Sequence, residues 1–396
     1  MHSTSVSIAT PESYSVPAGV SYVLRAIAAI GGLVFLVGLF VAPREAWAGY
    51  LSGFFLFVEM GLAGAIFLAM LKIAGARWST ALRRIPEAMA GTLPVAALLG
   101  LILLGGVHTL YEWSHPGITE TDWLLAGKAP YLNVPFFILR MVAFFALWIV
   151  LSRRMIRASR EQDTGVGRPE ARRMLSAALA FIPVFAITFS LASVDWLESL
   201  EPHWFSTIYG LVTLSSLASL GLAVCMVLAI QLRRGPLRKI VRADHLDDLG
   251  KLGISFTLFW GYIWYCQYML IWYTDMPEET PYYALRAQGG WKMMTYLSVI
   301  LNWAIPFFAL MPKAVRRSPR HMLQIAYVMI AGQAVNMIVL VAPSQMGPDP
   351  SMSLFVIAPI IGAIALFFLM ALRGLAAAPL VPMRDPDLVE SMSYHC

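Results

Sequence analysis

The sequence predicts an all-α integral membrane protein with ten transmembrane helices. Hydrophobic residues make up 59% of the chain, charged residues make up only 13%, and the mean hydropathy is +0.68. A soluble domain carries about 25% charged residues. The hydrophobic residues gather in runs of about 20, which is the length that crosses a bilayer as a helix. The charges between these runs alternate in sign along the chain, as repeated membrane crossing requires.

The apolar runs define the ten predicted spans. We interpret the first run as a span and not as a signal peptide, because it exceeds the roughly 7–15 apolar residues of such a peptide and Met1–Val20 contains no Lys or Arg. In chain order the predicted spans are Tyr22–Val41, Tyr50–Leu71, Ala90–Tyr111, Asn133–Leu151, Met174–Ser193, Thr207–Leu232, Leu252–Tyr273, Met293–Met311, Met322–Val341 and Leu354–Leu372.

Lys and Arg concentrate in every second connection between spans. The opposite loops hold few cations and many acids, namely Glu112, Glu120, Asp122, Asp195, Glu198, Glu201, Asp275, Glu278, Glu279 and Asp349. Cytoplasmic loops of membrane proteins carry the excess of Lys and Arg, so both termini are predicted to be cytoplasmic and the acidic loops periplasmic. The net charge of +6 is thus sorted by membrane side, and it does not indicate nucleic-acid binding.

Spans two to five and six to nine form two sets of four with the same orientation. This arrangement predicts two parallel four-helix bundles, flanked by the first and tenth spans. The predicted divisions are an N-terminal cytoplasmic tail (1–21), a flanking helix (22–45), a first bundle (46–195), a second bundle (196–345), and a flanking helix with a C-terminal cytoplasmic tail (346–396).

The three cysteines, Cys225, Cys266 and Cys396, form neither a CxxC nor a CxxCH motif. Self-contained iron–sulfur and c-type haem sites use such motifs. We therefore expect this chain to bind no metal or cofactor of its own.

Two charges lie deep inside predicted spans. At about 1.5 Å per residue, Arg140 lies about 10 Å and Glu59 about 14 Å below the outer surface. Lone charges are costly in the membrane and commonly mark ion or proton paths. We therefore expect Glu59 and Arg140 to meet each other or water in the first bundle, with His108 and Glu112 at the outer end of a proton path. An ion pair that only joins two helices is the structural alternative.

Further polar residues extend this set of proton-path candidates: Asp195, His203, Asp248 and Gln333. Gln333 shares a helix face with Asn336, and with Asn302 they predict hydrogen bonds between helices; a water-bearing path is the alternative. Asp247 and Asp248 suit the N-terminus of a helix and are also placed to form a path entrance.

The stretch Ser193–Gly210 is an acidic and aromatic loop between two apolar runs. We expect Trp196, Trp204 and Phe205 to lie in the headgroup layer, where aromatic rings are half wet. We also expect the acidic outer loops to dock partner proteins, with Glu198 and Trp204 as contact points.

Four stretches resemble one family in order along the chain: Y-L-N-V-P-F-F-I-L-R (Tyr131–Arg140), D-W-L-E-S-L-E-P-H-W-F-S-T (Asp195–Thr207), D-D-L-G-K-L (Asp247–Leu252), and Q-Y-M-L-I-W-Y with M-P-E-E-T-P-Y-Y (Gln267–Tyr283). They resemble the NrfD-like F subunit of bacterial alternative complex III, a quinol:electron-acceptor oxidoreductase. The chain departs from the common D-W-M pattern at Leu197, which we expect only to repack the loop.

The resemblance implies a redox-inert, multi-pass subunit of the bacterial inner membrane that anchors the complex and offers a proton path or part of a quinol site. It implies as partners a larger NrfD-like quinone-binding subunit, pentahaem and monohaem cytochrome c subunits, an iron–sulfur subunit and small membrane subunits. Haem and iron–sulfur clusters would belong to these partners, and menaquinol would be the substrate of the complex. A ten-span secondary transporter and a purely structural anchor for a peripheral enzyme are the alternatives.

Overall fold

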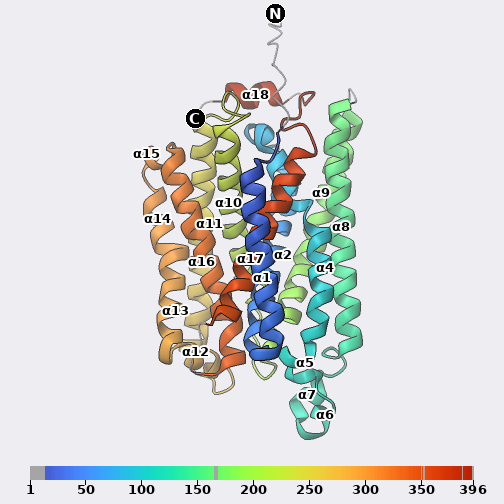
Figure 1. Ribbon diagram of the computed structural model, residues 1–396, viewed down its shortest axis with the longest axis vertical. Helices are drawn as coiled ribbons and strands as arrows, with labels where there is room; N and C mark the ends of the chain where they lie inside the picture. The colour runs from blue at the N-terminus through green and yellow to red at the C-terminus, as the bar shows by residue number, and fades with distance from the viewer. Residues whose placement is uncertain (1–13, 165–167, 349, 351–352, 386, 395–396) are drawn as a thin grey trace, which may run out of the picture.

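The computed structural model describes residues 14–164, 168–348, 350, 353–385 and 387–394, and its regular elements within these ranges are all helices (Figure 1). The predicted N-terminal tail lies largely outside this part, as do Asp349 and Cys396. The α-helices are α1 (Ala18–Val41), α2 (Pro43–Ile73), α3 (Arg84–Ala90), α4 (Leu93–Leu103), α5 (Val107–Leu110), α6 (Ile118–Thr121), α7 (Trp123–Lys128), α8 (Val134–Thr164), α9 (Arg168–Trp196), α10 (Tyr209–Arg234), α11 (Ala243–Thr274), α12 (Thr280–Arg286), α13 (Gly289–Val299), α14 (Ile305–Leu310), α15 (Lys313–Arg316), α16 (Pro319–Met346), α17 (Leu354–Ala376) and α18 (Leu388–Ser393). Four 3₁₀ turns, η1 (Arg77–Leu82), η2 (Leu104–Gly106), η3 (Glu112–Ser114) and η4 (Glu198–Leu200), and one π turn, η5 (Ile300–Ala304), complete the set.

Within the described residues, nine helical segments are long and apolar enough to cross a membrane. They are α1, α2, the run α3–α5, α8, α9, α10, the run α13–α14, α16 and α17. The predicted all-α membrane fold is therefore confirmed at this level, while the count of ten spans and the orientation remain predictions.

The seventh predicted span, Leu252–Tyr273, lies inside the 32-residue helix α11. Trp and Tyr are frequent from Phe259 to Tyr273 and lower the hydropathy of this helix. These residue types favour the membrane interface. Since α11 packs lengthwise on α10 and also contacts α14, its position matches that of the other long helices (Figure 1).

Helix α2 lies at the centre of the protein. All its residues from Ala46 to Ala69 except Tyr50 are buried. It contacts α3, α4, α8 and α9 on one side, α10 and α16 on another, and α1 and α17 on a third. Small residues allow this close packing, as a Cβ added at Gly221 of α10 would come within 2.1 Å of the Cβ of Ala63.

Two predicted spans are interrupted. The third is broken after Ala90 and again at η2, where Gly106 lies against the ring of Trp47. The eighth contains the π turn η5 just before Pro306. Proline has no backbone N–H and cannot continue the hydrogen-bond ladder, which accounts for the irregular turn.

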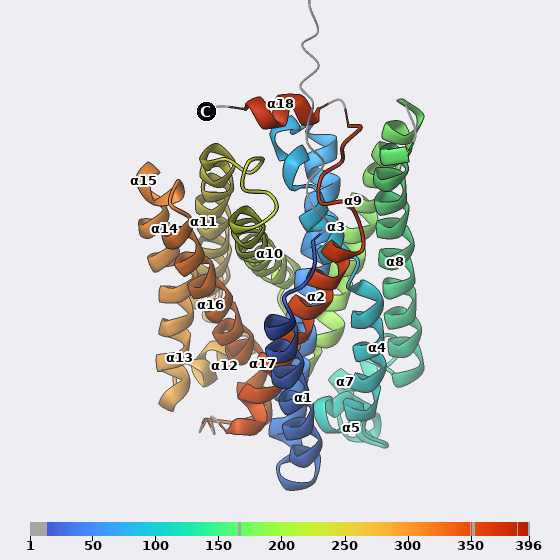
Figure 2. The same ribbon diagram turned by 45° about the horizontal axis from the view of Figure 1, so that its top comes forward.

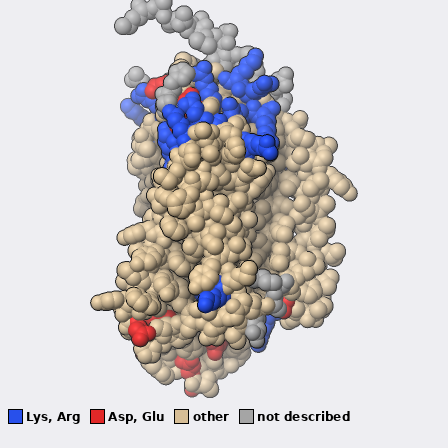
Figure 3. All heavy atoms as spheres, turned by 90° about the vertical axis from the view of Figure 1, so that its left-hand side faces the viewer, with Lys and Arg blue, Asp and Glu red and all other residues tan. Residues whose placement is uncertain are grey.

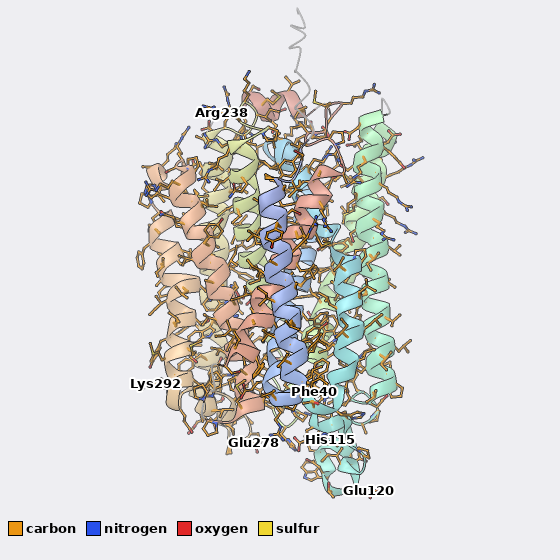
Figure 4. The ribbon with its side chains drawn as sticks, in the orientation of Figure 1. Phe40, His115, Glu120, Arg238, Glu278 and Lys292 are labelled. Carbon is orange, nitrogen blue, oxygen red and sulfur yellow. The ribbon has the colours of Figure 1, made fainter. Side chains whose placement is uncertain are left out.

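The charges separate along the long axis of the molecule. Figure 3 shows most Lys and Arg at one end of the visible face and Asp and Glu at the other. Helix α18 lies across the first end, beside the described ends of the chain (Figures 1 and 2). We call these the basic end and the acidic end; the labelled Arg238 lies at the former, and Glu278 and Glu120 at the latter (Figure 4).

Candidate functional site

Arg140 of α8 is paired with Asp195 of α9. The sequence had led us to expect that Arg140 would meet Glu59 or water. Its Nε and Nη2 donate to the two carboxylate oxygens at 2.7 and 2.9 Å, and its Nη1 donates to the carbonyl oxygen of Tyr131 at 2.9 Å. Both side chains are buried. Two bonds to one carboxylate form the geometry in which an arginine is held most firmly.

The expected pair fails because the two residues lie at different depths. Helix α2 begins at Pro43, seven residues before the predicted start, so Glu59 lies about 24 Å from the start of its helix at 1.5 Å per residue. Arg140 lies only about 9 Å from the start of α8. Helix α9 continues through Asp195, beyond its predicted end at Ser193, and so brings this carboxylate to Arg140.

Glu59 is fully buried, and neither carboxylate oxygen has a hydrogen-bond partner among the described residues. Its neighbours on α2 fix its direction. Phe55, one turn toward the acidic end, contacts the ring of Phe189 on α9, and Ala63, one turn toward the basic end, contacts Gly221 on α10. Since residues four apart share a helix face, Glu59 faces the seam between α9 and α10.

A polar contact crosses the seam between Glu59 and the acidic end. The hydroxyls of Ser193 on α9 and Thr213 on α10 are 2.7 Å apart, and both side chains are buried. Ser193 lies about one turn beyond Phe189, and Thr213 lies about two turns beyond Gly221. Asp195, two residues after Ser193, faces Arg140 of α8 on the other side of α9, so the seam brings the Ser193–Thr213 hydroxyls but not the ion pair toward Glu59.

The segment Asp195–Phe205, which we call the cap, joins both halves of the chain at the acidic end. Glu201 accepts a hydrogen bond of 2.8 Å from Arg286 of α12, and the ring of Trp204 stacks on Tyr282 with a centroid distance of 3.9 Å. The guanidinium of Arg286 also donates to the carbonyl oxygens of Tyr282, Val339 and Leu340. The cap is thus bonded to α8 on one side and to α12 on the other, and Arg286 links α12 in turn to α16.

Two aromatic residues of the cap lie in the core and not in the headgroup layer as predicted. Trp196 is 0% exposed and packs against Phe54 and Phe145, and Trp204 is only 5% exposed. Glu198 is also buried, and its Oε1 accepts from the backbone N–H of Ser206. Neither Trp204 nor Glu198 can therefore serve as a contact point for a partner, although Phe205 is exposed.

Helices α6 and α7 form a lobe that projects beyond the other helices at the acidic end (Figure 1). His203 of the cap contacts Asp122 at 2.5 Å, and Lys128 donates to the carbonyl oxygen of Pro202 at 2.6 Å. Asp122 also caps α7 by accepting from two backbone N–H groups. The hydrogen bond from His203 and these backbone bonds lower the pKa of Asp122. His203 therefore fastens the lobe, and no described hydrogen bond joins it to Glu59.

His108 and Glu112 lie apart from the buried seam. Both are exposed; His108 Nδ1 contacts Ser114, and His115 contacts the carbonyl oxygen of His108 at 2.7 Å. The label of His115 in Figure 4 marks this position beside the lobe. Within the described residues no hydrogen bond connects His108 or Glu112 to Glu59 or Arg140, so the structure does not bring the four expected residues together.

At the basic end, the acids that open α11 form ion pairs. Asp247 contacts Arg316 at 2.7 Å and Lys251 at 3.2 Å, and Asp248 contacts Lys251 at 2.9 Å. Burial raises the pKa of Asp247, but the hydrogen bonds from Arg316 and Lys251 outweigh it, and the pKa is lowered. Asp244 pairs with Arg317. These contacts attach α11 to the α15–α16 connection.

The second half of the chain contains a buried polar layer with one residue from each of four helices. Asn336 of α16 donates to the Oγ of Ser216 on α10 at 3.1 Å, and the indole N–H of Trp260 on α11 donates to the same oxygen at 3.2 Å. Ser298 of α13 donates to Asn336 at 3.3 Å. The predicted hydrogen bonding between helices is present here, with serines that the sequence analysis had not selected.

One turn toward the basic end, Gln333 belongs to a second tier with Ser219 and Asn302. All three side chains are fully buried. The Nε2 of Gln333, the Oγ of Ser219 and the Oδ1 of Asn302 lack hydrogen-bond partners among the described residues. Buried polar atoms are normally satisfied, so these three atoms stand out within the second bundle. The S-S-L-A-S pattern around Ser219 was the sequence signal for it.

In the described part of the chain no group of three or more His, Cys, Asp or Glu side chains is arranged to hold a metal ion. Comparison with protein-family models and with curated proteins gives no match. What the structure defines is the class, an all-helical protein with nine segments suited to span a membrane.

Proposed function

We propose that the chain is a redox-inert, ten-span subunit of a respiratory quinol:electron-acceptor oxidoreductase of the alternative complex III type, in the bacterial inner membrane. One observation carries the proposal. The stretches that resemble the NrfD-like F subunit lie far apart in sequence but contact one another at the acidic end: Arg140 with Asp195, and Trp204 with Tyr282. Such mutual pairing explains why these residue types occur together.

The lobe of α6 and α7 is the proposed docking surface for the cytochrome and iron–sulfur partners. Trp123 is 84% exposed, and Glu120 and Glu112 are exposed beside it. Exposed aromatic side chains such as Trp123 are common anchors of protein interfaces, and the acidic groups beside it would steer a positively charged partner. Under the positive-inside rule the lobe is periplasmic and both termini are cytoplasmic.

Glu59 is the proposed proton-carrying group, with an exit along the α9–α10 seam toward the hydroxyls of Ser193 and Thr213. This route replaces the expected exit through His108 and Glu112. A buried carboxylate without partners holds a proton readily, and the Ser193–Thr213 hydroxyls lie next along the seam. The electrons themselves would pass only through partner subunits, and menaquinol would be the substrate of the complex.

The test is purification of the complex from native membranes through an affinity tag on this chain. We expect c-type haem absorbance and multihaem cytochromes to elute with it. Glu120→Lys on the lobe should reduce the haem recovered, whereas Glu278→Lys, an exposed acid at the same end but off the lobe, should not. Elution of the chain without haem proteins would refute the proposal.

A secondary transporter remains the second candidate, because Glu59 is buried without a partner and the third span is broken. Such transporters usually carry interruptions at corresponding places in their two repeats. Here the interruptions fall in the third and eighth predicted spans, which do not correspond. Substrate-driven uptake by the isolated chain in liposomes would favour this candidate.

A further inference from the structure

A cavity of about 620 Å³ opens at the basic end between α1, α10, α16 and α17. It results from the crossing of α1 and α17. At the crossing, a Cβ added to Gly31 would lie 2.7 Å from the Cα of Gly362, so the two backbones touch. Leu24 and Phe368, six to seven residues from the crossing, already line the cavity. The two helices diverge toward the basic end, and α10 and α16 form the back wall.

The lining is sorted by depth. Helix α10 rises toward the basic end, so Val227 and Leu228 lie deeper than Gln231 and Arg234. Helix α1 runs the other way, so Leu24 lies deeper than Ser15. The deep part is therefore hydrocarbon, and the part near the surface offers a guanidinium, an amide and a hydroxyl.

The cavity is open on the side that faces the bilayer. Val20 of α1 and Tyr327 of α16 line it and are 45% and 50% exposed. A ligand can therefore enter from the membrane without crossing the protein. It must also match the excess of Lys and Arg at this end (Figure 3).

We propose that this cavity binds one anionic glycerophospholipid from the bilayer leaflet at the basic end. Arg234, the last residue of α10, forms no ion pair with any described residue and is exposed at the mouth. Its planar guanidinium can form two parallel hydrogen bonds with a phosphodiester. Gln231 and Ser15 can donate to the phosphate or glycerol oxygens. An acyl chain fills the apolar depth, and basic pockets between helices on the cytoplasmic side commonly hold such headgroups.

The experiment uses the full chain, purified in mild detergent and stripped of lipid. The chain is titrated with phosphatidylglycerol or phosphatidylcholine, and native mass spectrometry counts the bound lipid molecules. We expect one tightly bound phosphatidylglycerol and weaker binding of phosphatidylcholine. Arg234→Gln should weaken phosphatidylglycerol binding about fivefold, the effect of one basic residue near an anionic headgroup. Arg154→Gln removes an exposed charge from α8, away from the cavity, and should change nothing.

A steric pair of variants tests the same site without changing charge. Val20→Trp fills the mouth and should abolish the bound lipid, whereas Val23→Trp, equally exposed on α1 but outside the cavity, should leave it bound. Both positions are exposed, so folding should be retained, as size-exclusion chromatography would show. Equal effects within either pair, equal affinity for the two lipids, or an isoprenoid quinone as the co-purified occupant would overturn the proposal.

Discussion

Replacing Asp195 with Asn should lower the free energy of unfolding by about 3–5 kcal/mol, the cost of leaving one member of a buried ion pair without its partner. The estimate applies because Asp195 and Arg140 are 0% and 6% exposed and are joined by two hydrogen bonds. An asparagine keeps the shape but supplies no negative charge, so the guanidinium stays buried beside a neutral group. At 1.4 kcal/mol per decade, the folded fraction relative to the unfolded falls more than about 100-fold.

The measurement is unfolding in mixed detergent micelles with increasing dodecyl sulfate, followed by tryptophan fluorescence. Trp196 adjoins Asp195 in the chain and reports on the site. The double variant Asp195→Asn with Arg140→Gln should recover most of the loss, because both charges are then absent. Glu278→Gln, an exposed carboxylate at the same end, should stay within about 0.5 kcal/mol of the parent. A loss below about 1 kcal/mol for Asp195→Asn, or additive losses in the double variant, would refute the reasoning.

Three further predictions concern single residues. Glu59→Leu should raise the free energy of unfolding by about 1–3 kcal/mol, because it removes buried oxygens without partners. If Glu59 carries protons, Glu59→Gln should keep electron transfer in the assembled complex but lower the number of protons moved per electron. Gly332→Ala should destabilise by about 1–3 kcal/mol in the same unfolding assay, since the new Cβ would lie 2.8 Å from Asn302 Oδ1. The contact of Asp122 with His203 lowers the pKa of Asp122 from 3.8, so the contact stabilises the lobe above pH 3.8 and is lost as the pH falls below that value. Limited proteolysis of the lobe by pepsin should therefore accelerate below pH 3.8. The variant Asp122→Asn should abolish this pH dependence.

Much of the fold could be predicted because apolar run length and loop charge are strong signals for membrane helices. They located the nine segments that are long and apolar enough to span. The same signals could not locate helix ends. Charged residues such as Asp195 mark the edge of an apolar run, yet α9 continues through it because Arg140 neutralises it inside the protein.

The candidate site was less predictable, because depth and direction depend on packing between helices. Glu59 was selected correctly as a buried carboxylate, but a start of α2 seven residues earlier than predicted changed its depth and its neighbours. Trp196 and Trp204 are of a residue type that favours the headgroup layer. They are buried because the cap folds between the helices. The serines of the polar layer were not selected from the sequence, although Ser216 and Ser219 share a helix face at i, i+3; only the structure shows which helices they contact.

The central position of α2 limits how the two halves of the protein can move. Alternating-access transporters commonly rock one bundle against the other as rigid bodies. Helix α2 packs against α9 on one side and α10 on the other, with Gly221 seated directly on Ala63. A rocking motion would have to separate a backbone contact on one of these sides and expose buried surface in the middle of the membrane. The halves are therefore expected to move as one block, so any coupling to partner subunits would pass through side-chain protonation and bound water rather than through a change in overall shape.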